Sequence, residues 1–158
     1  MRNPEKVYWD SSVWIALIKK EIVDGVNRYE NSKLILEEAR DNKVTIYTSR
    51  ITIVEVHKTR HNPQLTRDED DRIQEDFLSH QYIKQIDVDK AVAYHARDLS
   101  WEYGLKPCDA IHLASALKVN AEVLHHWDGD FDKVPVNIIL SENPLKWIKQ
   151  TAMAGDNF

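Results

Sequence analysis

Short β-prone segments alternate with helical segments along almost the whole chain, and this order constrains the fold more than any other feature. Apolar, aromatic and β-branched residues predict strands at Lys6–Trp9, Val44–Thr48, Tyr82–Val88, Glu122–His126 and Val136–Leu140. Strands that alternate with helices pair in parallel through right-handed crossovers, and the helices cover both faces of the sheet. The sequence therefore predicts an α/β fold with a mostly parallel sheet.

Start and stop signals place the helices between these strands. Ser11 or Ser12 can cap a helix that runs to about Lys20, and Ser49 can cap one that runs toward Arg60. A helix from Asp89 ends at Gly104, and Pro107 suits the first position of the next. Helices are also predicted over residues 26–41, 68–80 and 144–150, with a loop over residues 61–66.

Length and composition fit one folded unit. The 158 residues suffice for a single core, and 42% hydrophobic with 30% charged residues is ordinary for a soluble globular protein. Cys108 has no partner for an internal disulfide, and the first ten residues lack the apolar stretch of a signal peptide. No run of about 18 apolar residues predicts a membrane span. We expect a cytoplasmic protein that does not enter a membrane.

The charge balance narrows the classes of function. A formal net charge of −5 is the wrong sign for a protein that binds nucleic acid by phosphate neutralisation alone. It counts less against a nuclease, because divalent cations offset the acids and bridge to phosphate. The four glycines are too far apart to build a glycine-rich phosphate loop. A local excess of positive charge over residues 50–67 is either an RNA backbone track or a solvated helix face.

Four carboxylates stand at conspicuous positions: Asp10, Glu55, Asp109 and Asp128. Asp10 and Asp128 each follow a predicted strand, at the sheet edge where α/β proteins bind ligands. Glu55 lies beside the apolar residues Ile51 and Val54, where a lone buried carboxylate costs several kcal/mol. Each also has an ordinary structural explanation: Asp10 as a helix cap, Asp109 as an acid in a first helical turn, and Asp128 as an Asp-Gly turn residue.

Taken together, the acids predict a metal site. Four carboxylates that converge at one sheet edge repel one another unless a cation binds. Oxygen-only ligands suit Mg²⁺ or Mn²⁺, and such ions activate water for phosphodiester cleavage. The residues thus favour a metal-dependent nuclease.

Four segments, in this order, resemble the PIN-domain nucleases, and in particular the VapC-like toxins of prokaryotic toxin–antitoxin pairs: VYWDSSVWIALI, TSRITIVEVHK, KPCDAIHLASAL and EVLHHWDGDFDKV. The resemblance covers about residues 6–140. It implies a three-layer α/β/α fold with a mostly parallel central sheet of four to five strands. It also implies a catalytic domain over 1–140, with a helix and tail over 141–158 that belong to the same domain.

The resemblance assigns roles to individual residues. The metal-binding and catalytic acids would be Asp10, Glu55, Asp109 and Asp128. Asp130 matches an auxiliary acid, and Ser12 matches a small polar residue that orders the metal-bound waters. The family commonly has Thr or Ser two residues before the last acid, where this chain has His126, which puts the hydrogen bonding around Asp128 in doubt. The implied activity is an Mg²⁺- or Mn²⁺-dependent ribonuclease acting on RNA, usually a homodimer held inactive by an antitoxin.

Other interpretations of the residues stay open. A catalytically silent PIN-like module that binds RNA or a protein is the first alternative, and a hydrolase of small phosphoesters is the second. His57 and His61 have helical spacing for a zinc pair, but position 58 is Lys rather than the Glu of a metalloprotease helix. His112 follows Asp109 by one turn and is expected to be a packed, hydrogen-bonded helix residue. No G-x-S-x-G motif indicates a serine nucleophile, and the thiolate of Cys108 is disfavoured beside Asp109.

Overall fold

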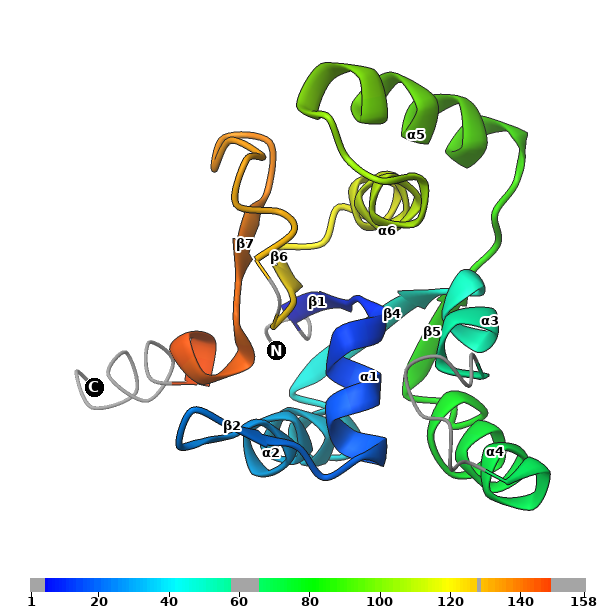
Figure 1. Ribbon diagram of the computed structural model, residues 1–158, viewed down its shortest axis with the longest axis vertical. Coiled ribbons are helices and arrows are strands. Elements are labelled where there is room, and N and C mark those ends of the chain that lie inside the picture. Colours follow the sequence, from blue (N-terminus) through cyan, green and yellow to red (C-terminus); the bar gives the residue numbers. More distant parts are fainter. Residues whose placement is uncertain (1–4, 58–65, 128, 149–158) are drawn as a thin grey trace.

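A computed structural model describes residues 5–57, 66–127 and 129–148. Within them, a five-stranded sheet lies between two groups of helices (Figure 1). A further helical turn covers residues 144–148. In chain order the elements are β1 (Glu5–Trp9), α1 (Ser11–Ile18), β2 (Ile22–Val23), β3 (Val26–Asn27), α2 (Arg28–Arg40), β4 (Val44–Ser49), α3 (Ile51–His57), α4 (Arg67–Ile73), the π-helical turn η1 (Gln74–Leu78), β5 (Ile83–Ile86), α5 (Lys90–Tyr103), α6 (Pro107–Lys118), β6 (Val123–His125) and β7 (Leu140–Glu142).

The sheet is parallel throughout, with β1 at its centre. Its strand order is β5-β4-β1-β6-β7, and Val7 of β1 lies opposite Ile46 of β4 and Val123 of β6. The chain moves from β1 to one side through β4 and β5, and to the other side from β6 to β7. The direction of winding therefore changes between β1 and β6, where α/β sheets bind ligands beyond the carboxyl ends of their strands. The predicted α/β fold with a mostly parallel sheet is confirmed.

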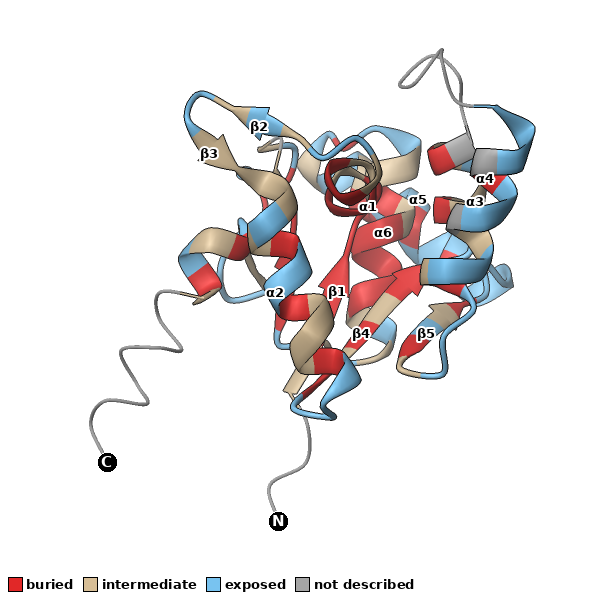
Figure 2. Cartoon of the chain, turned by 90° about the horizontal axis from the view of Figure 1, so that it is seen from below, coloured by how far each residue is buried: buried red, intermediate tan, exposed pale blue. Residues whose placement is uncertain are grey.

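Alternating side chains of β1 build the two cores. Val7 and Trp9 pack on the face covered by α1 and α2, whereas Tyr8 packs on the face covered by α5 and α6. All three side chains are fully buried. Figure 2 shows this as buried colour along β1, α1 and α6, with exposed residues on the outer helices. The central strand is thus apolar on both sides, as expected for a parallel sheet.

The N-terminal half departs from the prediction at a hairpin. The helix predicted over 26–41 begins at Arg28, because Val26 and Asn27 pair with Ile22–Val23 in an antiparallel hairpin. Its turn residues have positive φ, 51° at Asp24 and 77° at Gly25, as an Asp-Gly hairpin turn requires. Asn27 then caps α2 by accepting the Glu30 N–H at 3.0 Å.

The last predicted strand is wrong in position. Only Leu140 of the segment Val136–Leu140 is in a strand, and β7 is Leu140–Glu142. Residues 136–138 form a turn after Pro135, whose carbonyl accepts the Ile138 N–H at 3.0 Å. Val136 is 74% exposed. Its apolar character therefore reflects a surface turn and not a buried strand.

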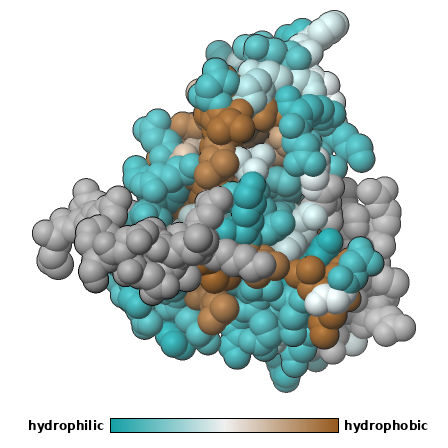
Figure 3. Space-filling view, turned by 90° about the vertical axis from the view of Figure 1, so that its left-hand side faces the viewer, coloured by the Kyte–Doolittle hydropathy of each residue, from teal (hydrophilic) through white to brown (hydrophobic). Residues whose placement is uncertain are grey.

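The surface seen in Figure 3 is mostly hydrophilic, with hydrophobic atoms in separate patches. Among the described residues, no helix combines the length and the apolar character needed to cross a membrane.

Candidate active site

Asp10 follows β1 at the carboxyl edge of the sheet and is the N-cap of α1, so the predicted caps Ser11 and Ser12 are the first helical residues instead. Its Oδ1 accepts hydrogen bonds from the Ser12 N–H at 3.0 Å and the Ser12 hydroxyl at 2.6 Å. The Ser12 Oγ in turn accepts the Trp127 N–H at 3.0 Å, which ties the start of α1 to the segment after β6. Asp10 is both a helix cap and an edge carboxylate, so the two explanations of this residue do not compete.

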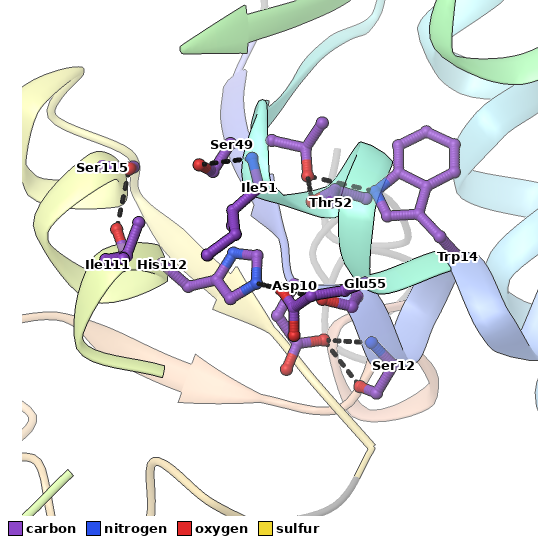
Figure 4. Close-up of polar contacts among 12 residues, drawn as sticks. Asp10, Ser12, Trp14, Ser49, Ile51, Thr52, Glu55, Ile111, His112 and Ser115 are labelled. Atoms are coloured by element: carbon purple, nitrogen blue, oxygen red, sulfur yellow. Dashed lines mark hydrogen bonds and ion pairs between the residues drawn. The ribbon is translucent and has the colours of Figure 1, made fainter. Parts of the chain in front are cut away.

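Glu55 reaches the same edge from α3. Thr52 in the first turn of α3 is hydrogen-bonded to Thr48 of β4 at 2.8 Å, which fixes the helix against the end of the strand (Figure 4). Glu55 Oε1 accepts the Ser11 hydroxyl at 2.6 Å and lies 2.6 Å from His112 Nε2. The expected apolar stripe does not include Val54, which is 58% exposed. The helix presents Glu55 to the site and Val54 to solvent.

Asp109 enters from the first turn of α6, two residues after Pro107. The pKa of its carboxyl is raised from 3.8 to about 6, chiefly by burial and then by the carboxylates of Asp130 and Glu55, against the lowering effect of His112 and Lys106. Acids from α3 and from the segment after β6 thus contribute to the raised pKa of this α6 carboxyl.

The segment after β6 supplies Asp130, and the predicted acid Asp128 lies outside the described residues. Gly129 has a φ of +73°, as the Asp-Gly turn signal predicts. At the position where the family commonly has Thr or Ser, the buried His126 accepts the Gly129 N–H on Nδ1 at 3.2 Å and packs its ring edge-on to Phe131. His126 thus holds the backbone of this turn.

These acids line a single cleft of about 430 Å³. The cleft brings Asp10, Glu55, Asp109 and Asp130 together, with Ser11, Ser12 and His112 between them. Glu21 adds a further acid, and the cations on the lining are Lys19, Arg28 and Lys106. Figure 4 shows Asp10, Glu55 and His112 pointing toward one another from three elements.

Comparison with known families identifies the family to which this fold belongs. A family model of the PIN domain matches residues 7–137. The chain belongs to the PIN domain family.

Several solved structures are similar in fold to this chain over most of its length. A toxin–antitoxin complex from Klebsiella pneumoniae has a TM-score of 0.63 at 22% identity and covers 87% of this chain and 97% of that one. VapBC2 from Rickettsia felis, bound to a DNA fragment of its promoter, gives 0.63 at 19% identity, covering 87% and 98%. VapC20 from Mycobacterium tuberculosis, a toxin that cleaves the sarcin-ricin loop, gives 0.60 at 19% identity, covering 80% and 92%. The predicted likeness to VapC-like PIN proteins is confirmed in family and fold. Curated protein sequences give no match.

Sequence reasoning missed the part that His112 and Tyr8 play in the PIN site. His112 is packed and hydrogen-bonded as expected, but its partner is the candidate acid Glu55. On the other side of the ring, Nδ1 lies 2.7 Å from the Tyr8 hydroxyl. Burial raises the pKa of Tyr8 well above its usual value, followed in effect by the Asp10 carboxylate. The phenol therefore stays protonated and donates a hydrogen bond to Nδ1. The proton of the ring is then on Nε2, which donates to Glu55.

The two described cations of the basic segment over residues 50–67, Arg50 and Arg67, do not line the PIN cleft. Arg50 pairs with Asp87 and donates to Gln85 at 3.2 Å, and Arg67 pairs with Asp71 one turn on at 3.1 Å. Lys58, Arg60 and His61 lie outside the described residues. The two described cations are engaged by their own neighbours, as on a solvated surface.

The residues of the PIN cleft fit a hard divalent cation. Their donors are carboxylate oxygens, and the carboxylates of Asp130 and Glu55 contribute, after burial, to the raised pKa of Asp109. Within 5–57, 66–127 and 129–148, however, no three His, Cys, Asp or Glu side chains are close enough to hold an ion jointly.

Proposed function

We propose that this PIN protein is a metal-dependent endoribonuclease that hydrolyses RNA phosphodiester bonds. The observation that supports the proposal most directly is the gathering of Asp10, Glu55, Asp109 and Asp130 around one cleft. Asp10, Glu55, Asp109 and Asp128 would hold Mg²⁺ or Mn²⁺, with Asp130 as an auxiliary acid. When bound, the ion supplies Lewis-acid chemistry, lowering the pKa of water and offsetting charge on the phosphate.

The chain's own residues hold the carboxylates in position. Ser12 holds Asp10 by two hydrogen bonds, both made to Oδ1. Ser11 and His112 likewise both contact Oε1 of Glu55. Fixed orientations of this kind are what neighbours of metal-binding carboxylates provide.

The biological setting belongs to the proposal as well. The structural neighbours include complexes of toxins with antitoxins. We propose that this chain is the toxin of such a pair, that it acts in the cytoplasm as a homodimer, and that an antitoxin protein restrains it by covering the acid cleft. Residues 141–158 would belong to the catalytic domain, since Ser141 and Glu142 already lie in β7 of its sheet.

The test combines one variant with a metal titration. Asp109→Asn is expected to reduce RNA cleavage about 100-fold or more, because even changes next to metal ligands cost 10- to 100-fold. Its fold should be retained, which circular dichroism checks. Excess EDTA should abolish cleavage, and Mn²⁺ should raise the melting temperature of the wild type.

The outcomes separate the proposal from its alternatives. Full activity of Asp109→Asn, or of the wild type in EDTA, would overturn it. A protein that binds RNA without metal-dependent turnover would be the silent PIN-like module, which the unusual His126 motivates. Turnover of nitrophenyl phosphate without cleavage of RNA would indicate the small-phosphoester hydrolase.

A further inference from the structure

Helix α5 carries alternating cations and aromatic rings on one exposed face. Lys90, Tyr94, Arg97 and Trp101 follow one another at intervals of three or four residues, so they form a single stripe, the α5 stripe. Trp101 is 82% exposed and Tyr94 is 58% exposed. The Lys90 Nζ lies over the Tyr94 ring at 6.0 Å. Burying an aromatic residue is favourable, so two rings left in water on one helix face indicate a binding surface.

The α5 stripe borders a groove that leads to the acid cleft. A cavity of about 330 Å³ lies between α5 and α6, with Arg97 and Trp101 on one wall and Pro107, Ala110 and Ile111 on the other. Pro107 also lines the acid cleft, next to Lys106 and two residues before Asp109. A ligand that crosses Pro107 therefore passes from the candidate catalytic acids to the exposed indole.

The charge of the α5 stripe distinguishes two possible occupants of the groove: a second copy of the chain and single-stranded nucleic acid. The α5 stripe contains two cations and no acid, so two copies of the chain packed stripe to stripe would set like charges against each other. Arg97 makes no ion pair with any residue in the part of the chain that the structure describes. A cation between two exposed rings matches single-stranded nucleic acid, which offers phosphates and base faces in alternation.

We propose that the α5 stripe is a binding site for the single strand of RNA adjacent to the scissile phosphate. A base stacks on Trp101 in the groove, and Arg97 binds a backbone phosphate of the strand that passes over Pro107. This proposal rests on the proposed function, since it extends the substrate path of the same cleft. It makes Trp101 and Arg97 positioning residues that act on substrate binding and not on the bond cleaved.

Kinetics on long and short substrates test this site. On a single-stranded RNA of about 12 nucleotides, Trp101→Ala should raise KM about tenfold with kcat little changed, whereas Trp101→Phe should retain most of the affinity. A dinucleotide has no strand beyond the two nucleotides at the cleaved bond to pass over Pro107, so its KM should be the same for all three proteins. Arg97→Glu should raise KM and flatten the salt dependence, and the matched charge reversal Lys84→Glu on the exposed side of β5 should not.

A binding measurement keeps the test independent of cleavage. Trp9, Trp14 and Trp147 are at most 7% exposed and Trp127 is partly buried, whereas Trp101 is 82% exposed, so Trp101 is the indole best placed for quenching by an added RNA in Mg²⁺. Quenching that is larger in the wild type than in Trp101→Phe supports the site, even if the wild type cleaves nothing and the proposed function fails. An unchanged KM in Trp101→Ala, or quenching as large in Trp101→Phe as in the wild type, would overturn it. Sedimentation that shows Trp101→Ala converting a dimer to a monomer would also overturn it, since the stripe would then be a contact between protein copies.

Discussion

At the scale of single residues, His112 links a buried phenol to a carboxylate in the cleft. Both ring nitrogens are engaged, Nδ1 by Tyr8 at 2.7 Å and Nε2 by Glu55 at 2.6 Å. His112→Ala leaves two polar groups without this partner, so we expect a loss of about 1–3 kcal/mol in unfolding free energy. Because Glu55 also loses an orienting contact, kcat should fall about 10- to 100-fold. Urea titration and steady-state kinetics measure the two effects.

A comparison of variants separates orientation from stability. Tyr8→Phe removes only the hydroxyl that fixes the tautomer, and His112→Gln keeps a side-chain donor near Glu55. If His112→Ala unfolds more easily but cleaves RNA at the wild-type kcat, its role is structural alone.

The carboxyl of Asp109 gives the metal-free protein a defined pH dependence. Its pKa is raised from 3.8 to about 6, so its contribution to stability is fully present below about pH 4 and is lost as the pH rises through about 6. Asp109→Asn has no such loss. In EDTA near pH 7.5 we expect this variant to be about 1–2 kcal/mol more stable than the wild type, after discounting for solvent screening. Denaturant titrations at both pH values check this, and a constant difference between pH 4 and pH 7.5 would contradict it.

The sequence pointed to the candidate acids Asp10, Glu55 and Asp109, which line one cleft, but not to the residues that contact them. Asp10 and Asp109 stood out at a strand end and a helix start, and Glu55 stood out as an acid in an apolar segment. These acids lie close together because the carboxyl ends of parallel strands meet at one edge of the sheet. The alternation of strands and helices in the sequence predicts that sheet. The contact between His112 and Glu55 joins residues 57 positions apart and depends on how α3 and α6 are rotated. No periodicity encodes that rotation.

At the scale of elements, a left-handed glycine ends α5 at the corner that leads to α6. Gly104 ends α5 with a φ of +64°, and its carbonyl accepts Lys133 Nζ at 2.7 Å. A Cβ at this position would meet only Lys133 Nζ, at 3.9 Å, so the cost of a side chain is conformational.

Gly104→Ala is therefore expected to lose about 1 kcal/mol of stability, and Gly104→Asn less, because Asn tolerates positive φ. Thermal denaturation measures both variants. Since the acids keep their positions, kcat per folded molecule should stay at the wild-type value, and a fall in kcat with unchanged stability would contradict this account.

Elements were predictable where their own residues decide them. The signals at Gly104 and Pro107 gave the limits of α5 and α6, because a left-handed residue and a fixed φ act locally. The hairpin of β2 and β3 was missed because its strands have only two residues each. The predicted helix over 68–80 is divided into α4 and the π-helical turn η1, a change of hydrogen bonding that residue spacing does not reveal.

At the scale of the whole molecule, most contacts of the central strand reach far along the chain. β1 pairs with β4 and with β6, and the Asp10 N–H donates to the His125 carbonyl at 3.3 Å. The α/β class was predictable because alternation of elements restricts the topology to few choices. The order of the strands was not, since any apolar segment can pair with several others.

β6 is synthesised late although it pairs with the first strand, β1, and this affects how the protein folds during synthesis. A ribosome making this protein releases Asp10, Glu55 and Asp109 well before Val123–His125, the strand that β1 requires as its neighbour. Contacts of such long range form only after the intervening chain is available. A fragment that ends at residue 121 should therefore not form the folded sheet, which circular dichroism of the fragment made by cell-free translation checks. A folded fragment would contradict this reasoning; an unfolded one means that Asp10, Glu55 and Asp109 come together only after Val123–His125 has been made.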